Sequence, residues 1–274
     1  MATPGDKRGL ECKFVMPPRK KPAQRALPKA RDLNTSLAPI VPAPEYVVSK
    51  LLPCEKMVAI DVETHELVPK EGSLVPWSRD QFGLQSKTTA SILSTLRVVQ
   101  LGWAVGTNSE DMVVKSIMVR PDGFRVSPGA TKKHGICNEK LESDGVPLGE
   151  ALQMMLTDVL KHWSNGARIV SHNLPFDAGL IYEELCRAGL FQLQTDWVDA
   201  IRGGICTMDP DICSWARSLI GLEDKSRSVP VGLKTLISGL VPDAKTLLHK
   251  HHSADGDAAM HLALCRKLVS LCTA

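Results

Sequence analysis

Two acidic side chains follow directly from an apolar run in the segment Met57–Thr64, which reads Met-Val-Ala-Ile-Asp-Val-Glu-Thr. Asp61 and Glu63 are two residues apart, and on a β-strand such residues point to the same side. Carboxylates crowded at the end of a buried strand repel each other and lose solvation, which a bound cation relieves. The pair therefore predicts a metal-binding position. The alternative is a solvated strand end with both acids exposed.

A third carboxylate, Asp177, ends the segment His172-Asn173-Leu174-Pro175-Phe176-Asp177. The segment follows a short predicted strand and opens a predicted helix, so Asp177 can reach back over the sheet edge. The alternative role for an early helical Asp is stabilisation of the helix dipole.

The last predicted helix begins at Gly256, within the segment His252-Ser253-Ala254-Asp255-Gly256-Asp257. Asp257 projects from the first helical turn, and His252 lies on the preceding loop, where it is freer to move. The alternatives are a helix-start carboxylate and a surface histidine within the cluster of His249, His251 and His252.

The elements between these segments follow from the spacing of apolar residues. Strands are predicted at 57–62, 97–105, 112–119 and 168–171, and helices at 148–163, 176–188, 232–240 and 256–271. Residues 195–220 are predicted to be mostly helical with a break at Pro210, and residues 120–145 to be loop. This order predicts an α/β domain on a mixed sheet.

The composition suits a protein with a substantial core, since 43% of the 274 residues are hydrophobic. No apolar stretch reaches the length of about 18 residues that a membrane span requires, and no N-terminal segment suits secretion. The eight cysteines form no C-x-x-C pair, which favours a reduced intracellular compartment over a disulfide framework or a zinc site. Nucleus or cytoplasm is expected rather than an organelle.

Residues 1–50 are expected to be a disordered, basic, proline-rich tail, and residues 51–274 to be the folded domain. Nine Lys and Arg against four Asp and Glu lie within residues 1–49, which leaves the folded part slightly acidic. The cluster Pro17-Pro18-Arg19-Lys20-Lys21 suits contacts with phosphates, nuclear import or a merely solvated tail.

Taken together, the three acidic segments resemble the DEDDh branch of the proofreading-type 3′→5′ exonucleases, which have a ribonuclease H-like fold. Asp61-Val62-Glu63 matches the D-x-E motif of that family, residues 172–177 its H-N-x-x-F-D motif and residues 252–257 its H-x-x-x-x-D motif. Residues 98–105 resemble the second strand of the family, and His134-Gly135-Ile136 its usual loop. The likeness extends over roughly residues 55–272, and implies a mixed five-stranded sheet flanked by helices.

The resemblance implies roles for these residues. Asp61, Glu63, Asp177 and Asp257 would hold two Mg²⁺ or Mn²⁺ ions, with Asp177 acting through water, and His252 would be the general base. Thr64 and His65 would lie against the terminal nucleotide, although His65 departs from the small residues usual there. Asn173 would either contact the substrate or bond within its loop.

The implied reaction removes nucleoside 5′-monophosphates from the 3′ end of DNA or RNA. An insertion at about 66–96 offers Trp77, Arg79 and Phe82 for stacking on a nucleic acid, or is an idle insertion. Because many members of the family form dimers, the resemblance also leaves a homodimer open.

Two other interpretations remain. The first is a catalytically idle nucleic-acid-binding domain on the same fold, against which the presence of all five catalytic positions argues. The second is a metalloprotein that uses His249, His251 and His252, against which the lack of H-x-x-x-H or C-x-x-C spacing argues.

Overall fold

The computed structural model describes residues 41–52, 54–68, 92–108, 112–222, 230–242 and 244–273. All of them belong to one compact unit, Ala38–Ala274. The predicted tail before residue 41 and most of the predicted insertion, including Trp77, Arg79 and Phe82, lie outside the described residues.

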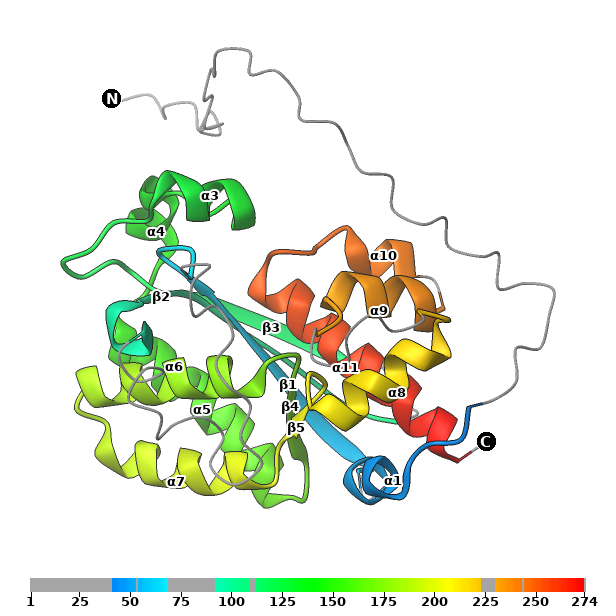
Figure 1. Cartoon of the computed structure of the whole chain (residues 1–274). Coiled ribbons are helices and arrows are strands. Elements are labelled where there is room, and N and C mark those ends of the chain that lie inside the picture. Colours follow the sequence, from blue (N-terminus) through cyan, green and yellow to red (C-terminus); the bar gives the residue numbers. More distant parts are fainter. Residues whose placement is uncertain are drawn as a thin grey trace, which may run out of the picture. The chain divides into compact units, whose positions relative to one another are not determined.

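The described residues form a five-stranded sheet with the order β3-β2-β1-β4-β5 (Figure 1). The strands are β1 (Lys56–Thr64), β2 (Val98–Thr107), β3 (Val113–Met118), β4 (Arg168–Ser171) and β5 (Ile205–Cys206). Strand β1 pairs antiparallel with β2, which pairs antiparallel with β3. On its other side β1 pairs parallel with β4, and β4 pairs parallel with β5. The sheet is mixed and flanked by helices, so the predicted fold class is confirmed.

Helices cover both faces of the sheet (Figure 1). The first face packs against α5 (Leu148–Ser164), α6 (Leu174–Arg187) and α7 (Phe191–Arg202). The second packs against α1 (Glu45–Leu51), α8 (Pro210–Leu219), α9 (Leu233–Leu240), α10 (Ala244–Leu248) and α11 (Ala254–Cys272). None of the helices in the described part of the chain is long and apolar enough to cross a membrane.

Strand β1 contributes side chains to the cores on both faces of the sheet, because its side chains alternate between the two faces. Val58 and Ile60 belong to the core on the α5 side, whereas Met57 and Ala59 belong to the core on the α11 side. By the same alternation, the side chains of Asp61 and Glu63 point toward α11.

The region predicted to be a loop at 120–145 instead contains α3 (Pro128–His134) and α4 (Asn138–Asp144). The signals for α3 are local. Ser127 caps it by accepting from the Ala130 backbone N–H, Pro128 occupies the first turn, and Gly135 ends it with a φ of 76°. Both helices are only seven residues long, too short for an apolar stripe to stand out.

Three boundaries also differ from the prediction. Helix α1 begins at Glu45, before the expected start of the folded part, because Val47 and Leu51 are buried in the core beside α11. Leu93, near the end of the predicted insertion, is buried in the core on the α5 side of the sheet. Strand β5 interrupts the predicted helical region at 195–220 before Pro210. It was not predicted because a strand of two residues gives no detectable alternation.

Candidate active site

The acidic pair of β1 lies at the end of the strand, on the face that α11 covers. Asp61 pairs with Gly102 of β2, and Glu63 pairs with Gln100. The register shifts between Glu63 and Thr64, a bulge of the kind that re-aims side chains beside active sites. Glu63 is only 8% exposed, so its carboxylate points into the protein.

Helix α11 can approach the strands because Gly102 has no side chain. A Cβ at this position would lie 2.1 Å from the carbonyl carbon of Ala254, the first residue of the helix. The Ala254 backbone N–H donates to Gln100 Oε1 over 3.0 Å, and Ser253 caps the helix. The start of α11 is therefore held against β2, and this places Asp257 of its first turn near the end of β1.

Asp177 reaches the same region from the first turn of α6. Its buried carboxylate accepts a hydrogen bond from the hydroxyl of Ser171, the last residue of β4, and another from the backbone N–H of Val62. Strand β4 pairs with β1 only as far as Ala59, so on this side of Val62 the opening of α6 takes the place of a strand, whereas on its other side Val62 pairs with Leu101 of β2. Asp177 thus joins the ends of two parallel strands.

The sequence-predicted carboxylates come together in space. Oxygens of Asp61, Glu63 and Asp257 lie within 4.8 Å of one another, with Asp177 close enough to raise the pKa of Asp61. Burial raises the pKa of Glu63 to about 7, and the Asp257 charge adds to this rise. Burial likewise raises the pKa of Asp177 to about 7 and holds that of Asp61 well above its usual range. Crowded, desolvated carboxylates are a donor set that fits a hard divalent cation.

Two consecutive histidines border the carboxylates. His251 Nδ1 lies 2.9 Å from Asp257 Oδ1, and the backbone N–H of His252 donates to the same oxygen over 3.2 Å. The two rings stack with centroids 3.7 Å apart. His252 has a φ of 71°, a left-handed conformation that is uncommon outside glycine and recurs at functional sites. Burial, followed by the charge of His251, lowers the pKa of His252, so its ring is neutral at pH 7.

Among the described residues, the histidine cluster differs from the one considered in the sequence. His251 and His252 share a possible metal-ligating group with Asp257, and His249 is not part of it. The match to the H-x-x-x-x-D motif assigned the general base to His252, yet of these two histidines it is His251 whose ring touches a carboxylate. Its role as a neighbour of Asp257 was not predicted.

The residues expected near a substrate continue from β1. The Thr64 carbonyl accepts from His134 Nε2 over 3.1 Å, and His134 Nδ1 accepts from the Ile136 backbone N–H. Because Nδ1 is an acceptor, Nε2 carries the proton, and His134 fastens α3 to the end of β1. In the sequence, His134 was identified only as part of a loop that resembles one in the exonuclease family.

The ring of His65 is likewise held by a hydrogen bond from a backbone N–H group. His65 Nδ1 accepts from the Arg97 backbone N–H over 3.2 Å, which leaves Nε2 as the protonated nitrogen. The ring packs edge-on against Phe124, with centroids 5.3 Å apart. Asn173 lies half-buried on the loop before α6, at the cap position, and makes no side-chain cap bond to the helix.

One buried histidine beside the carboxylates was missed altogether. His261 of α11 is 2% exposed, and its Nε2 lies 3.8 Å from Asp61 Oδ1. The available signal was its position four residues after Asp257, which places both on one helix face.

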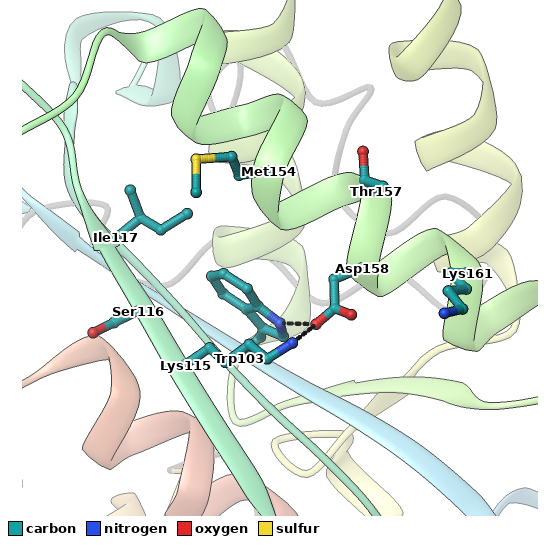
Figure 2. A pocket seen from close by; sticks show the side chains of 8 residues that line it. All are labelled: Trp103, Lys115, Ser116, Ile117, Met154, Thr157, Asp158 and Lys161. Atoms are coloured by element: carbon teal, nitrogen blue, oxygen red, sulfur yellow. Dashed lines mark hydrogen bonds and ion pairs between the residues drawn. The ribbon is translucent and has the colours of Figure 1, made fainter.

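A pocket of about 560 Å³ lies elsewhere, between β2, β3 and α5 (Figure 2). Asp158 sits in its wall and accepts from Trp103 Nε1 over 2.7 Å and from Lys115 Nζ over 2.8 Å. Trp103 belongs to the core on the α5 side. The pocket therefore opens on the face of the sheet opposite the carboxylates.

No family model and no curated protein sequence matches the chain. Solved structures do match. The zinc-bound complex of E. coli exonuclease I with single-stranded DNA has a TM-score of 0.52 at 13% identity, over 79% of this chain and 41% of that one. The E. coli exonuclease I complex with a dA16 oligonucleotide has a TM-score of 0.53 at 14% identity, over 79% and 41%. The fold is similar to that of exonuclease I.

A third match, exonuclease I of Methylocaldum szegediense, has a TM-score of 0.50 at 16% identity, over 79% of this chain and 40% of that one. This chain spans about four tenths of the length of the exonucleases it matches. The likeness confirms the exonuclease-like fold that the motifs predicted.

Proposed function

We propose that this chain is a metal-dependent 3′→5′ exonuclease that releases nucleoside 5′-monophosphates from single-stranded nucleic acid. The observation that supports it is the meeting of Asp61, Glu63 and Asp257, from a strand and a distant helix, within 4.8 Å of one another. The E. coli structures with single-stranded DNA favour the same class of substrate.

In this proposal Asp61, Glu63 and Asp257 hold one divalent cation, and Asp177 supports a second through water. Bound Mg²⁺ or Mn²⁺ would supply positive charge to the phosphate as its bond breaks. Ser171 keeps the Asp177 carboxylate directed at β1, and Gly102 lets α11 hold Asp257 in place. The carboxylates of Asp177 and Asp257 are oriented by hydrogen bonds before a substrate arrives, so they need little reorganisation during the reaction.

His252 is the proposed general base. Its lowered pKa keeps the ring neutral at pH 7, which is the form that accepts a proton from an attacking water. His251 is the less suitable candidate because its Nδ1 is engaged with Asp257 Oδ1. We assign to His251 the role of orienting Asp257.

The terminal nucleotide is proposed to lie against Thr64 and His65, with Asn173 facing it from the loop before α6. His65 Nε2 is a hydrogen-bond donor with a fixed tautomer. The contact of Thr64 with His134 keeps this end of β1 from shifting.

The decisive experiment follows the full chain acting on single-stranded DNA and RNA labelled at the 5′ end, with Mg²⁺ or Mn²⁺. A ladder that shortens from the 3′ end is expected, and a blocked 3′ terminus should prevent it. Asp61→Asn should lower the rate by roughly 10³-fold, because it removes several kcal/mol of charge stabilisation. Asp255→Asn, on the same turn of α11 as Asp257, is the matched control and should retain activity.

Equal rates for Asp61→Asn and the wild-type chain would refute the assignment. Binding of the oligonucleotide without shortening in any metal would favour the idle binding domain instead.

A further inference from the structure

Glu184 is a fully buried carboxylate on α6 that the proposed metal site does not use. It lies seven residues after Asp177, so both acids lie on one face of the same helix. Its Oε1 accepts from the Val98 backbone N–H over 2.9 Å and from Arg97 Nε over 3.2 Å, and lies 3.3 Å from Arg187 Nη1. A single buried oxygen therefore receives two arginines and the first N–H of β2.

The stability of the fold alone does not account for a carboxylate at this position. Glu184 Oε2 has no hydrogen-bond partner among the described residues, so part of the cost of its desolvation is not offset. A buried ion pair often stabilises a fold less than apolar side chains of similar volume would. The explanation for Glu184 therefore lies in what its partners hold in place.

Arg97 connects Glu184 to the nucleotide end of the site. Its backbone N–H donates to His65 Nδ1 over 3.2 Å, and its carbonyl oxygen accepts from the His65 backbone N–H over 3.0 Å. Its guanidinium lies over the Phe124 ring, 4.7 Å from the centroid, and donates to the Asp122 carbonyl over 3.3 Å. Since the Phe124 ring also packs against that of His65, Arg97 holds His65 both directly and through this ring.

The other ring nitrogen of His65 is left for a ligand. Among the described residues, His65 Nδ1 takes part in a hydrogen bond and Nε2 does not. Because Nδ1 accepts from a backbone N–H, Nε2 carries the proton and is a donor. His65 follows directly on β1, two residues beyond Glu63, so this donor lies at the border of the carboxylate cluster.

We propose that Glu184 is a positioning residue for the terminal nucleotide: through Arg97 it fixes His65, whose Nε2–H donates to an acceptor atom of that nucleotide. The inference rests on the proposed function of the carboxylate site. It assigns nucleotide affinity to this buried ion pair, and leaves the bond-breaking step to the carboxylates and His252.

The test is a double-mutant cycle on the affinity of the full chain for adenosine or thymidine 5′-monophosphate with Mn²⁺, measured by calorimetry. These monophosphates are products of the proposed reaction, so their binding is measured without turnover. His65→Ala should weaken binding by roughly 5- to 10-fold, the usual worth of one hydrogen bond. Glu184→Gln should weaken it by a similar factor, yet by less than about 2-fold when residue 65 is already alanine, because it acts through that ring.

The nuclease assay gives a second measurement on the same variants. Glu184→Gln should raise KM for a single-stranded oligonucleotide and leave kcat within about 2-fold of the wild-type value, as expected when an interaction contributes equally to the bound substrate and the transition state. Arg97→Lys keeps a positive charge beside Glu184 and covers the case in which Glu184→Gln does not fold. Its loss of nucleotide affinity should also disappear in the His65→Ala background.

Arg187→Gln is the matched control. It breaks the other ion pair of Glu184, but Arg187 donates to the carbonyl oxygens of Leu96 and Ser94 and makes no contact with His65. Its nucleotide affinity should stay within about 2-fold of the wild-type value, although its stability falls as well.

Additive losses from Glu184→Gln and His65→Ala would overturn the proposal, and so would wild-type affinity in Glu184→Gln. An equal loss in Arg187→Gln would also overturn it, because general destabilisation would then be the cause, as would failure of the wild-type chain to bind either monophosphate. The two proposals fail separately. Nucleotide binding with the expected coupling but without cleavage would contradict the exonuclease alone, and a nuclease with additive losses would contradict the role of Glu184 alone.

Discussion

At the residue scale, the proposed base is held in a backbone conformation that limits which substitutions are informative. His252 has a φ of 71°, where asparagine is tolerated better than alanine. His252→Asn should therefore fold normally and lower the rate by roughly 10²- to 10⁴-fold, the usual contribution of a general base. The measurement is the pH–rate profile, which should lose its dependence on a group that titrates below the usual pKa of histidine.

His251→Gln is the matched comparison. Its glutamine can still donate to Asp257, so a smaller loss of rate and an unchanged profile are expected. If His251→Gln abolished the pH dependence and His252→Asn did not, the roles of the two histidines would be reversed.

The raised pKa values of the carboxylates make a second residue-scale prediction, about stability without metal. Glu63 and Asp177 each bind a proton more tightly in the folded chain, with pKa values of about 7. Groups with raised folded-state pKa values stabilise the fold fully below their unfolded values, near pH 4, and lose this contribution as the pH rises to about 7. With a chelator present, the free energy of unfolding should fall over this range.

Glu63→Gln should flatten the fall, because its amide does not titrate, and saturating Mn²⁺ should offset the fall in the wild-type chain. Urea unfolding at several pH values tests both points. A free energy of unfolding that rises from pH 4 to pH 7 equally in the wild-type chain and Glu63→Gln would contradict this account of the cluster.

At the element scale, the position of α11 depends on the missing side chain of Gly102. Gly102→Ala would place a Cβ 2.1 Å from the backbone of Ala254, and backbone cannot rotate away as a flexible side chain can. We expect a loss of about 1–3 kcal/mol in stability. Metal affinity should fall as well, because Asp257 moves with the helix.

Gly149→Ala is the matched control. Gly149 lies in the first turn of α5 and nothing comes within 4 Å of an added Cβ, so stability should be unchanged or rise by up to about 1 kcal/mol. Unfolding curves and Mn²⁺ titrations of the two variants give the comparison. Wild-type Mn²⁺ affinity in Gly102→Ala would show that α11 does not set the position of Asp257.

At the scale of the whole molecule, charge is divided unequally along the chain. All nine Lys and Arg of the first 49 residues lie at or before Arg31, whereas the remainder of the chain is slightly acidic. We propose that this segment adds electrostatic affinity for nucleic acid. Removal of residues 1–40 leaves α1 complete, and should weaken binding and reduce its dependence on salt without loss of turnover at saturating substrate.

Binding isotherms over a range of salt concentrations test this proposal. Replacement of Arg19, Lys20 and Lys21 by alanine in the full chain should reproduce part of the effect. An unchanged affinity and salt slope after the deletion would make the segment a linker or a targeting signal.

Much of the fold and most of the carboxylate set could be predicted from the sequence, because those signals are local. The alternation in β1 shows that Asp61 and Glu63 share a face, and the predicted helix starts place Asp177 and Asp257 in first turns. The short helices α3 and α4 and the two-residue β5 were missed because so few residues carry no clear period.

The tertiary structure alone decided which side chains meet. His261 is 200 residues from Asp61 along the chain, and His134 is 70 residues from Thr64, yet each contacts its partner across packed elements. No local pattern encodes such a pairing, because it depends on how closely α11 and α3 approach the end of β1. Sequence determined the chemical groups and the faces that carry them, and packing determined the distances at which those groups can share a cation.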